Sequence, residues 1–281
     1  MTQFIIQLRG ELRKLFGRKR TYIGFGAFIA LEIVVLLIFQ IPRVQRSWRQ
    51  VLERAGFGFE DYFSGTTLAF QMVIWTAFIL GGLYVALVSG DIVAKEVEEG
   101  TMRMTLCRPV SRVRLLMLKY CACVIYTMSL VFFIGLSALA VGTIKEGTGG
   151  FFVFQPLAGL FQMYDTGAGI ARYLSALPFL GLSMVSVASL GFMLSCFNMK
   201  PAAATIGTLT YFMTDMIFRG IPYFSDIKEW FITSHTEAWY HVLRSPIPVQ
   251  DMLEDYAYLA GINATFVILG VLAFQTRDFK S

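Results

Sequence analysis

Long apolar runs dominate the chain and alternate with short polar segments. A helix of about 20 apolar residues crosses the roughly 30 Å hydrocarbon core of a bilayer, and six runs have or approach that length. Only helices and closed barrels satisfy their backbone in lipid, and no alternating strand pattern occurs, so the pattern predicts an all-α integral membrane protein. The six predicted transmembrane helices cover about residues 22–41, 66–89, 120–142, 173–197, 202–218 and 256–274.

The residues before the first run predict an amphipathic helix in the inner membrane interface, within about residues 1–20. Apolar residues recur at helical spacing while basic residues fall on other faces, a pattern typical of interfacial helices. A secretory signal fits poorly, because the apolar run after Arg20 is too long and no small-residue cleavage site follows it. The apolar positions are Phe4, Ile5, Leu8, Leu12 and Leu15, and the basic ones are Arg9, Arg13 and Lys14.

The composition agrees with a membrane protein. Hydrophobic residues make up 56% of the 281 residues and charged residues 15%, whereas soluble domains average about 25% charged residues. The formal net charge of +5 does not indicate a nucleic-acid partner, because membrane proteins place basic residues in cytoplasmic loops. The four cysteines form no C-x-x-C pair, so neither a zinc site nor a disulfide framework is indicated.

The distribution of Lys and Arg predicts a single multi-pass transmembrane domain with both termini cytoplasmic, because most basic residues then fall on the inner side. The predicted cytoplasmic loop covers residues 91–119, and the outer loops cover residues 42–65, 142–172 and 219–255. Four arginines in the first outer loop weaken this bias. They are Arg43, Arg46, Arg49 and Arg54.

A dense polar segment interrupts the apolar pattern between the second and third spans. Gly100 suits a helix C-terminus and Thr101 a helix N-cap, so a break there should precede a short helix. Arg108 and Pro109 would end that helix, and Ser111 would cap the helix of the third span. These signals predict a compact helical elbow. A solvated loop of anchoring charges is the alternative.

The elbow resembles the signature loop of type-2, exporter-like ABC transporter permeases, the membrane subunits of ATP-binding cassette systems. The matching pattern is D-x-x-A-x-E-x-E-x-G-T from Asp91, then L-x-R-P-V-S-R from Leu106 and the pair Leu118-Lys119. The amphipathic N-terminal helix, the six spans and the large loop before the last span resemble that family as well. Leu118 departs from the pattern, because the family often has glycine there.

The resemblance implies that the elbow carries a cytoplasmic coupling helix that docks on a separate ATPase subunit. A rigid elbow continuous with two spans can convert ATPase closure into helix tilting, whereas a flexible loop would absorb the motion. The residues that the motif assigns to this contact, or to the shape of the elbow, are Glu96, Glu98, Gly100, Thr101, Leu106, Arg108 and Pro109.

The resemblance also implies the partners. The chain contains no G-x-x-x-x-G-K-[ST] phosphate-binding loop, so ATP and Mg²⁺ are expected in the partner ATPase, and neither a cofactor nor an enzymatic reaction is expected in this chain. Six spans resemble half of a transporter, which implies a second permease, either an identical copy or a paralogue. The implied location is the plasma membrane, the inner membrane of a prokaryotic cell. The sequence carries no signature of the transported substrate.

Glu32 lies near the middle of the first predicted span. An isolated carboxylate there costs at least about 2.5–3.5 kcal/mol, so it should face the bundle interior, be protonated, or both. A role in the substrate pathway or in gating fits, and so does a structural hydrogen bond to a neighbouring helix. The first role would support an alternative function, an ion-coupled secondary transporter or channel, although no internal repeat typical of such transporters is visible.

The loop between the fifth and sixth spans contains both histidines of the chain. His235, Glu237 and His241 would scatter around a helix rather than converge, so no metal site is predicted. Ser234 and Glu237 fit an S-x-x-E capping box that would begin a short amphipathic helix on the outer surface. No catalytic motif accompanies the histidines, which disfavours a membrane-embedded enzyme.

Overall fold

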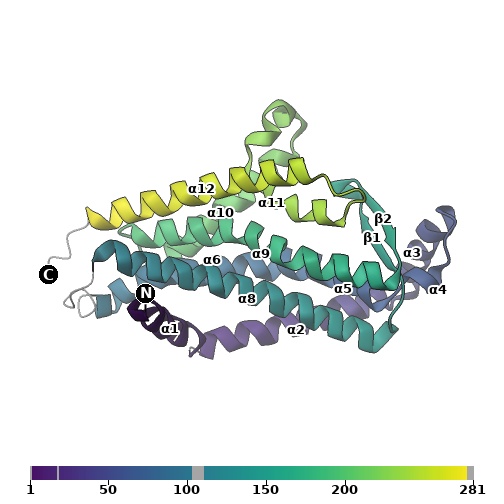
Figure 1. Cartoon of the computed structure of the whole chain (residues 1–281), viewed down its shortest axis with the longest axis horizontal. Coiled ribbons are helices and arrows are strands. Elements are labelled where there is room, and N and C mark those ends of the chain that lie inside the picture. Colours follow the sequence, from purple (N-terminus) through teal and green to yellow (C-terminus); the bar gives the residue numbers. More distant parts are fainter. Residues whose placement is uncertain (1, 18, 103–110, 277–281) are drawn as a thin grey trace.

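The computed structural model describes residues 2–17, 19–102 and 111–276. The protein is an elongated bundle of long helices (Figure 1). The N-terminal helix and the C-terminal end of the last helix lie at one end, which we call the terminal pole. A small β-hairpin and two short helices lie at the other end, the distal pole.

The long helices follow the predicted apolar runs, whereas two short helices, Pro42–Arg54 and Phe59–Tyr62, form within the predicted first outer loop, residues 42–65. In chain order the helices and strands are α1 (Thr2–Phe16), α2 (Lys19–Phe39), α3 (Pro42–Arg54), α4 (Phe59–Tyr62), α5 (Gly65–Thr76), η1 (Ala77–Gly81), α6 (Gly82–Glu98), α8 (Arg112–Glu146), β1 (Phe151–Gln155), η2 (Pro156–Ala158), β2 (Leu160–Tyr164), α9 (Thr166–Cys196), α10 (Pro201–Gly220), η3 (Pro222–Trp230), α11 (Ile232–Thr236), η4 (Ala238–Leu243) and α12 (Val249–Gln275).

Several helices are long and apolar enough to cross a bilayer, which confirms a helical, multi-pass membrane protein at this level. Within the described residues they are α5–η1–α6, which runs continuously through a π-helical segment, together with α8, α9 and α12. The pair α2 and α3 would be a fifth, and its axis bends by 72° between the two helices. The predicted span at 202–218 forms α10, which is outside this set.

Glycines bring the long helices into backbone contact. A Cβ atom on Gly142 of α8 would lie 2.4 Å from the carbonyl oxygen of Gly65 in α5. On the other side of the bundle, a Cβ on Gly191 of α9 would lie 2.0 Å from the Ser89 hydroxyl of α6. Small residues allow such close approach between membrane helices, and these two contacts fix how α5–α6 sits between α8 and α9.

The β-hairpin is a departure from the sequence prediction, which expected no strands. Strands β1 and β2 pair antiparallel, with Phe151 opposite Tyr164, and Gly159 turns between them at φ +63°. Trp48 of α3 packs edge-on against Phe152 and Phe154 of β1. Each strand is only five residues long, so its alternation of side chains cannot be distinguished in sequence from the aromatic loop around it. Packing against α3 stabilises this strand pair, which would be only marginally stable alone.

The segment between α10 and α12 also differs from its prediction. The capping box is wrong, because α11 already begins at Ile232. The Ser234 hydroxyl donates to the carbonyl of Lys228, and Glu237 instead forms an ion pair with Arg219. The apolar side chains that follow are buried against α9 rather than displayed on the outer surface. They are Trp239, Val242 and Leu243.

Candidate functional site

Four charged side chains from three helices meet near the terminal pole, and we call this cluster the polar junction. Glu11 and Lys14 come from α1, Glu96 from α6 and Lys119 from α8. The Lys119 ammonium lies 2.8 Å from Oε1 of Glu96 and 3.0 Å from Oε2 of Glu11. Lys14 lies 2.8 Å from Oε1 of Glu11 and 3.5 Å from Oε1 of Glu96. The junction therefore joins α1, α6 and α8 through two cations and two anions.

The centre of the polar junction is buried. The Lys119 side chain is 0% exposed and that of Glu96 is 8% exposed, whereas Lys14 is half exposed. Burial opposes the charge of Glu11, but the ammonium groups of Lys119 and Lys14 outweigh it and hold the Glu11 pKa below its ordinary value. Burial likewise opposes the charge of Lys14, and the carboxylates of Glu11 and Glu96 nevertheless raise its pKa.

One carboxylate oxygen of the junction has no hydrogen-bond partner in the described part of the chain. Oε2 of Glu96 is buried and accepts no hydrogen bond from the described residues. A buried ion pair stabilises a fold only when its geometry and remaining hydrogen bonds offset desolvation. In this cluster Lys119 contacts both carboxylates closely, and Lys14 makes a second close contact with Glu11.

The elbow begins directly after the helix turn that carries Glu96. Gly100 has φ +72° and its N–H donates to the carbonyl of Val97, so it ends α6 as the sequence predicted. The Thr101 hydroxyl donates to the carbonyl of Glu96, and Thr101 begins a new helical segment. This contact ties the start of the elbow to the backbone of the polar junction.

The elbow is shorter than the predicted loop over residues 91–119. Helix α6 continues to Glu98 and α8 begins at Arg112, because the polar residues there still favour a helix. Ser111 caps α8 by accepting a hydrogen bond from the Arg114 N–H at 3.3 Å, as predicted. Three residues of the motif, Leu106, Arg108 and Pro109, lie outside the described residues.

The structure separates two glutamates that the motif placed together. Glu96 points into the polar junction, whereas the Glu98 side chain is exposed. Two residues apart on α6, the two side chains point to nearly opposite sides of the helix, so one carboxylate faces the bundle and the other faces outward. Of the predicted elbow residues, Glu98 and Gly100 are exposed and Thr101 is partly buried.

Glu32 faces the bundle interior, as expected for a carboxylate in an apolar helix. It is 0% exposed, and the Ser137 hydroxyl of α8 donates to its Oε1 at 2.7 Å. Its Oε2 is buried with no hydrogen-bond partner among the described residues. The structural hydrogen bond to a neighbouring helix is thus present, and a pathway or gating role for Glu32 stays a prediction.

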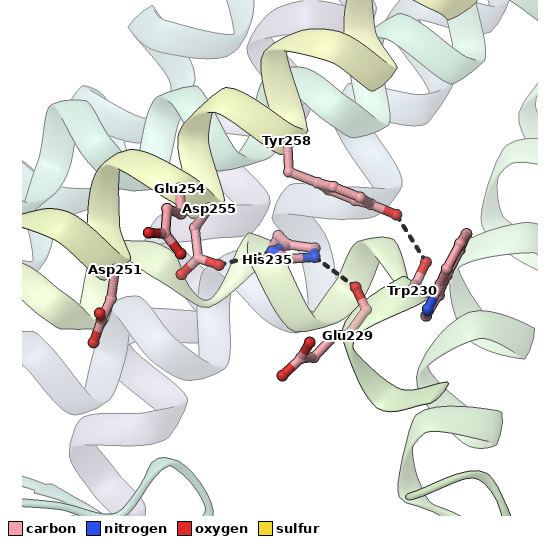
Figure 2. Close-up of a pocket in the computed structure, with 7 residues that line it drawn as sticks. All are labelled: Glu229, Trp230, His235, Asp251, Glu254, Asp255 and Tyr258. Carbon is pink, nitrogen blue, oxygen red and sulfur yellow. Dashed lines mark hydrogen bonds and ion pairs between the residues drawn. The ribbon is translucent and has the colours of Figure 1, made fainter. Parts of the chain in front are cut away.

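A second polar cluster lies beside the first turns of α12 (Figure 2). Asp255 of α12 holds both histidines. Its Oδ1 lies 2.7 Å from Nδ1 of His235 in α11, and its Oδ2 lies 2.9 Å from Nε2 of His241 in η4. Tyr258 donates to the Trp230 carbonyl across the same cleft. The tertiary fold therefore brings together two histidines that the helical spacing predicted to be apart.

The cleft beside this cluster has a volume of about 470 Å³. Within the described ranges, no three His, Cys, Asp or Glu side chains are arranged to hold a metal ion. Through its contacts with His235 and His241, Asp255 links α11 and η4 to α12. The residues that line the cleft are Glu229, Trp230, His235, Asp251, Glu254, Asp255 and Tyr258.

Comparison with known proteins matches residues 27–280 to a family described as "Protein of unknown function (DUF2705)". The chain belongs to the DUF2705 family. It is also similar to the "Uncharacterized protein YhcI" of Bacillus subtilis (strain 168), with 31% identity over 122 residues. That similarity covers 42% of this chain and 38% of the relative, so the chain matches well under half of the relative's length.

The DUF2705 match covers most of the candidate site but not all of it. Glu32, Glu96 and Lys119 fall inside the matched residues, whereas Glu11 and Lys14 precede them. Sequence reasoning assigned no contact to Glu11, Lys14 or Lys119. Two sequence signals could have indicated these contacts. Glu11 and Lys14 have the spacing of neighbours on one helix face, and Lys119 is a charged residue at the start of the third apolar run.

Proposed function

We propose that this chain is the membrane-spanning permease subunit of an ATP-driven exporter of the type-2 ABC class. The six spans would be α2, α5–α6, α8, α9, α10 and α12, with α1 in the inner membrane interface. Both termini would be cytoplasmic, in the plasma membrane of a prokaryotic cell. The terminal pole would then face the cytoplasm, where an ATPase subunit supplies ATP binding and Mg²⁺, and a second permease would complete the transporter.

The observation that supports this proposal best is the attachment of the elbow. It leaves α6 through Gly100 and returns through the Ser111 cap into α8. Directly behind it, Lys119 and Glu96 fasten α8 to α6 at 2.8 Å. Glu11 joins α1 to α8 through Lys119, and Lys14 joins α1 to α6 through Glu96. A displacement applied where the elbow leaves α6 or enters α8 would then move these helices together, which is what coupling to an ATPase needs.

Copurification tests the partnership. We expect the chain to copurify with a Walker-A ATPase encoded by a neighbouring gene when the two are expressed together. ATP hydrolysis by the complex should differ from that of the ATPase alone, because docking changes how its subunits close. A chain that purifies without any ATPase, in membranes that contain the candidate subunit, would refute the proposal.

Substitution in the elbow tests the coupling. Gly100→Val with Thr101→Leu should leave membrane insertion and ATPase binding intact but remove the effect of the permease on ATP hydrolysis. Gly56→Val is the matched control, because Gly56 also has positive φ (+83°) with no atom within 4 Å of its Cβ position. Gly56 lies between α3 and α4, the two short helices of the distal pole (Figure 1). Equal coupling in both variants would contradict the role of the elbow.

Glu32 supports a second candidate, an ion-coupled secondary transporter or channel. The observation in its favour is a fully buried carboxylate with one oxygen unpartnered among the described residues. In that case Glu32→Gln would abolish ion-driven flux in vesicles that contain this chain alone. An exporter that needs its ATPase would show no such flux with either residue.

A further inference from the structure

Helix α3 carries a patch of basic side chains at the distal pole, which we call the arginine face. It consists of Arg43, Arg46, Arg49 and Arg54, all exposed. Among the described residues none of the four forms an ion pair with a carboxylate, although Glu53 lies on the same helix. Four positive charges are therefore gathered on one short helix that carries a single carboxylate, Glu53.

The opposite side of α3 is already occupied by the protein itself. Leu52 is 0% exposed. Trp48 packs edge-on against Phe39, Phe152 and Phe154, with ring centroids 5.5–5.8 Å apart. Helix α3 therefore needs no lipid to cover its apolar side, and its position is held by the hairpin and by α2. On the arginine face, Arg49 stacks over the Phe59 ring at 4.8 Å and Arg46 donates to the Pro42 carbonyl, but no carboxylate among the described residues pairs with any of the four arginines.

The location of α3 places this face at the level of lipid headgroups. Helix α2 has 21 residues, which at 1.5 Å per residue extend about 31 Å, the thickness of the hydrocarbon core. The axis then turns by 72° into α3, at the pole opposite α1 (Figure 1). Arginine is strongly disfavoured in the hydrocarbon, so α3 lies across the end of α2, along the membrane surface.

We propose that the arginine face of α3 binds the phosphate groups of anionic lipid headgroups. Guanidinium groups bind phosphate through paired hydrogen bonds, and each basic residue near an anionic surface strengthens attachment about fivefold. The charge rule for orientation predicts few basic residues at this pole if the termini are cytoplasmic, and headgroup binding accounts for their presence. The inference holds for either orientation and does not depend on an ATPase partner.

The test compares the full chain in nanodiscs of phosphatidylcholine with nanodiscs of equal parts phosphatidylcholine and phosphatidylglycerol. The thermal midpoint of the wild-type chain should be higher in the anionic discs, and added NaCl should reduce the difference, because salt screens surface charges. The four-residue variant Arg43→Gln, Arg46→Gln, Arg49→Gln and Arg54→Gln should lose most of this difference. The corresponding four-lysine variant should keep most of it, since it keeps the charge.

The control removes two positive charges from other elements, Lys145→Gln with Lys228→Gln, and should keep the difference. If the four-glutamine variant fails to fold, the double variant Arg43→Gln with Arg54→Gln takes its place, because these two side chains make no hydrogen bond within the described ranges. The double variant should lose about half of the difference in thermal midpoint between the two kinds of nanodisc. A glutamine variant with the full wild-type difference, or a control that loses as much, would overturn the proposal. An equal rise on adding inorganic phosphate to phosphatidylcholine discs would also overturn it, since a free anion would then suffice.

Discussion

Replacing Lys119 by methionine tests whether the polar junction holds three helices together. Methionine keeps the length and the apolar stem of the side chain but removes the ammonium group. The carboxylates of Glu11 and Glu96, 3.0 and 2.8 Å from that ammonium, then remain in the same buried site. Lys14 is the only other cation of the junction.

The size of the stability loss depends on the two carboxylates that stay buried after the Lys119 ammonium is removed. Removing one partner of a buried ion pair costs about 3–5 kcal/mol, because the other charge stays desolvated and unpaired. Lys14 still contacts Glu11 at 2.8 Å and Glu96 at 3.5 Å, but its side chain is 52% exposed, so solvent weakens its compensation. We therefore expect a loss near the lower bound, about 3 kcal/mol in the free energy of unfolding.

Unfolding in mixed micelles, followed by circular dichroism, measures this loss. The matched control is Lys95→Met, which breaks an exposed pair with Glu99 at 4.0 Å and should cost less than about 1 kcal/mol. Adding Glu96→Gln to Lys119→Met should recover part of the loss, because one uncompensated buried charge is removed. If Lys119→Met costs no more than Lys95→Met, the junction does not stabilise the bundle and the reasoning fails.

Other perturbations address the helix packing, the buried carboxylate and the effect of pH. Gly142→Ala should cost about 1–3 kcal/mol of unfolding free energy, because its methyl group would overlap the α5 backbone. Gly82→Ala is the control and should cause no such loss, because its methyl group would meet no atom within 4 Å. The same unfolding assay compares the two variants. Ser137→Ala should cost about 1–3 kcal/mol because Glu32 loses its donor. A cost that is unchanged in a Glu32→Met background, which has no oxygen to accept this hydrogen bond, would contradict this. The pKa of Glu11 is lowered from 4.5, so its contribution to stability is complete above pH 4.5 and is lost as the pH falls further. A fluorescent probe on α1 should therefore report detachment only in acid below that value, and detachment near neutral pH would rule this out.

Local signals predicted the helices and the ends of the elbow. Gly100 ends α6 and Ser111 caps α8 because glycine tolerates positive φ and a serine hydroxyl accepts a free helix N–H, and both effects act over three or four residues. Apolar length likewise located α2, α5–α6, α8, α9, α10 and α12, since an apolar run of that length must be continuous in sequence to cross a membrane.

Long-range contacts were beyond such signals. The polar junction joins residues separated by more than 100 positions, as between Glu11 and Lys119, and no periodicity reports which helices will be neighbours. The capping-box prediction failed for a related reason. Glu237 has a nearby arginine, Arg219, on a different helix, and that ion pair competes with the local hydrogen bond.

The junction also constrains how the bundle can rearrange. Lys119 of α8 contacts α1 and α6 at the same time. Separating α6 from α8 would therefore leave Lys119 and Glu96 buried without their closest partner, and separating α1 would remove the second carboxylate from Lys119. Sliding one helix by a full turn would move its charge about 5.4 Å, beyond ion-pair distance. Small tilts that keep all three contacts cost much less. The helices next to the elbow are therefore expected to move as one unit, and α1, which the sequence presented only as an interfacial helix, moves with them.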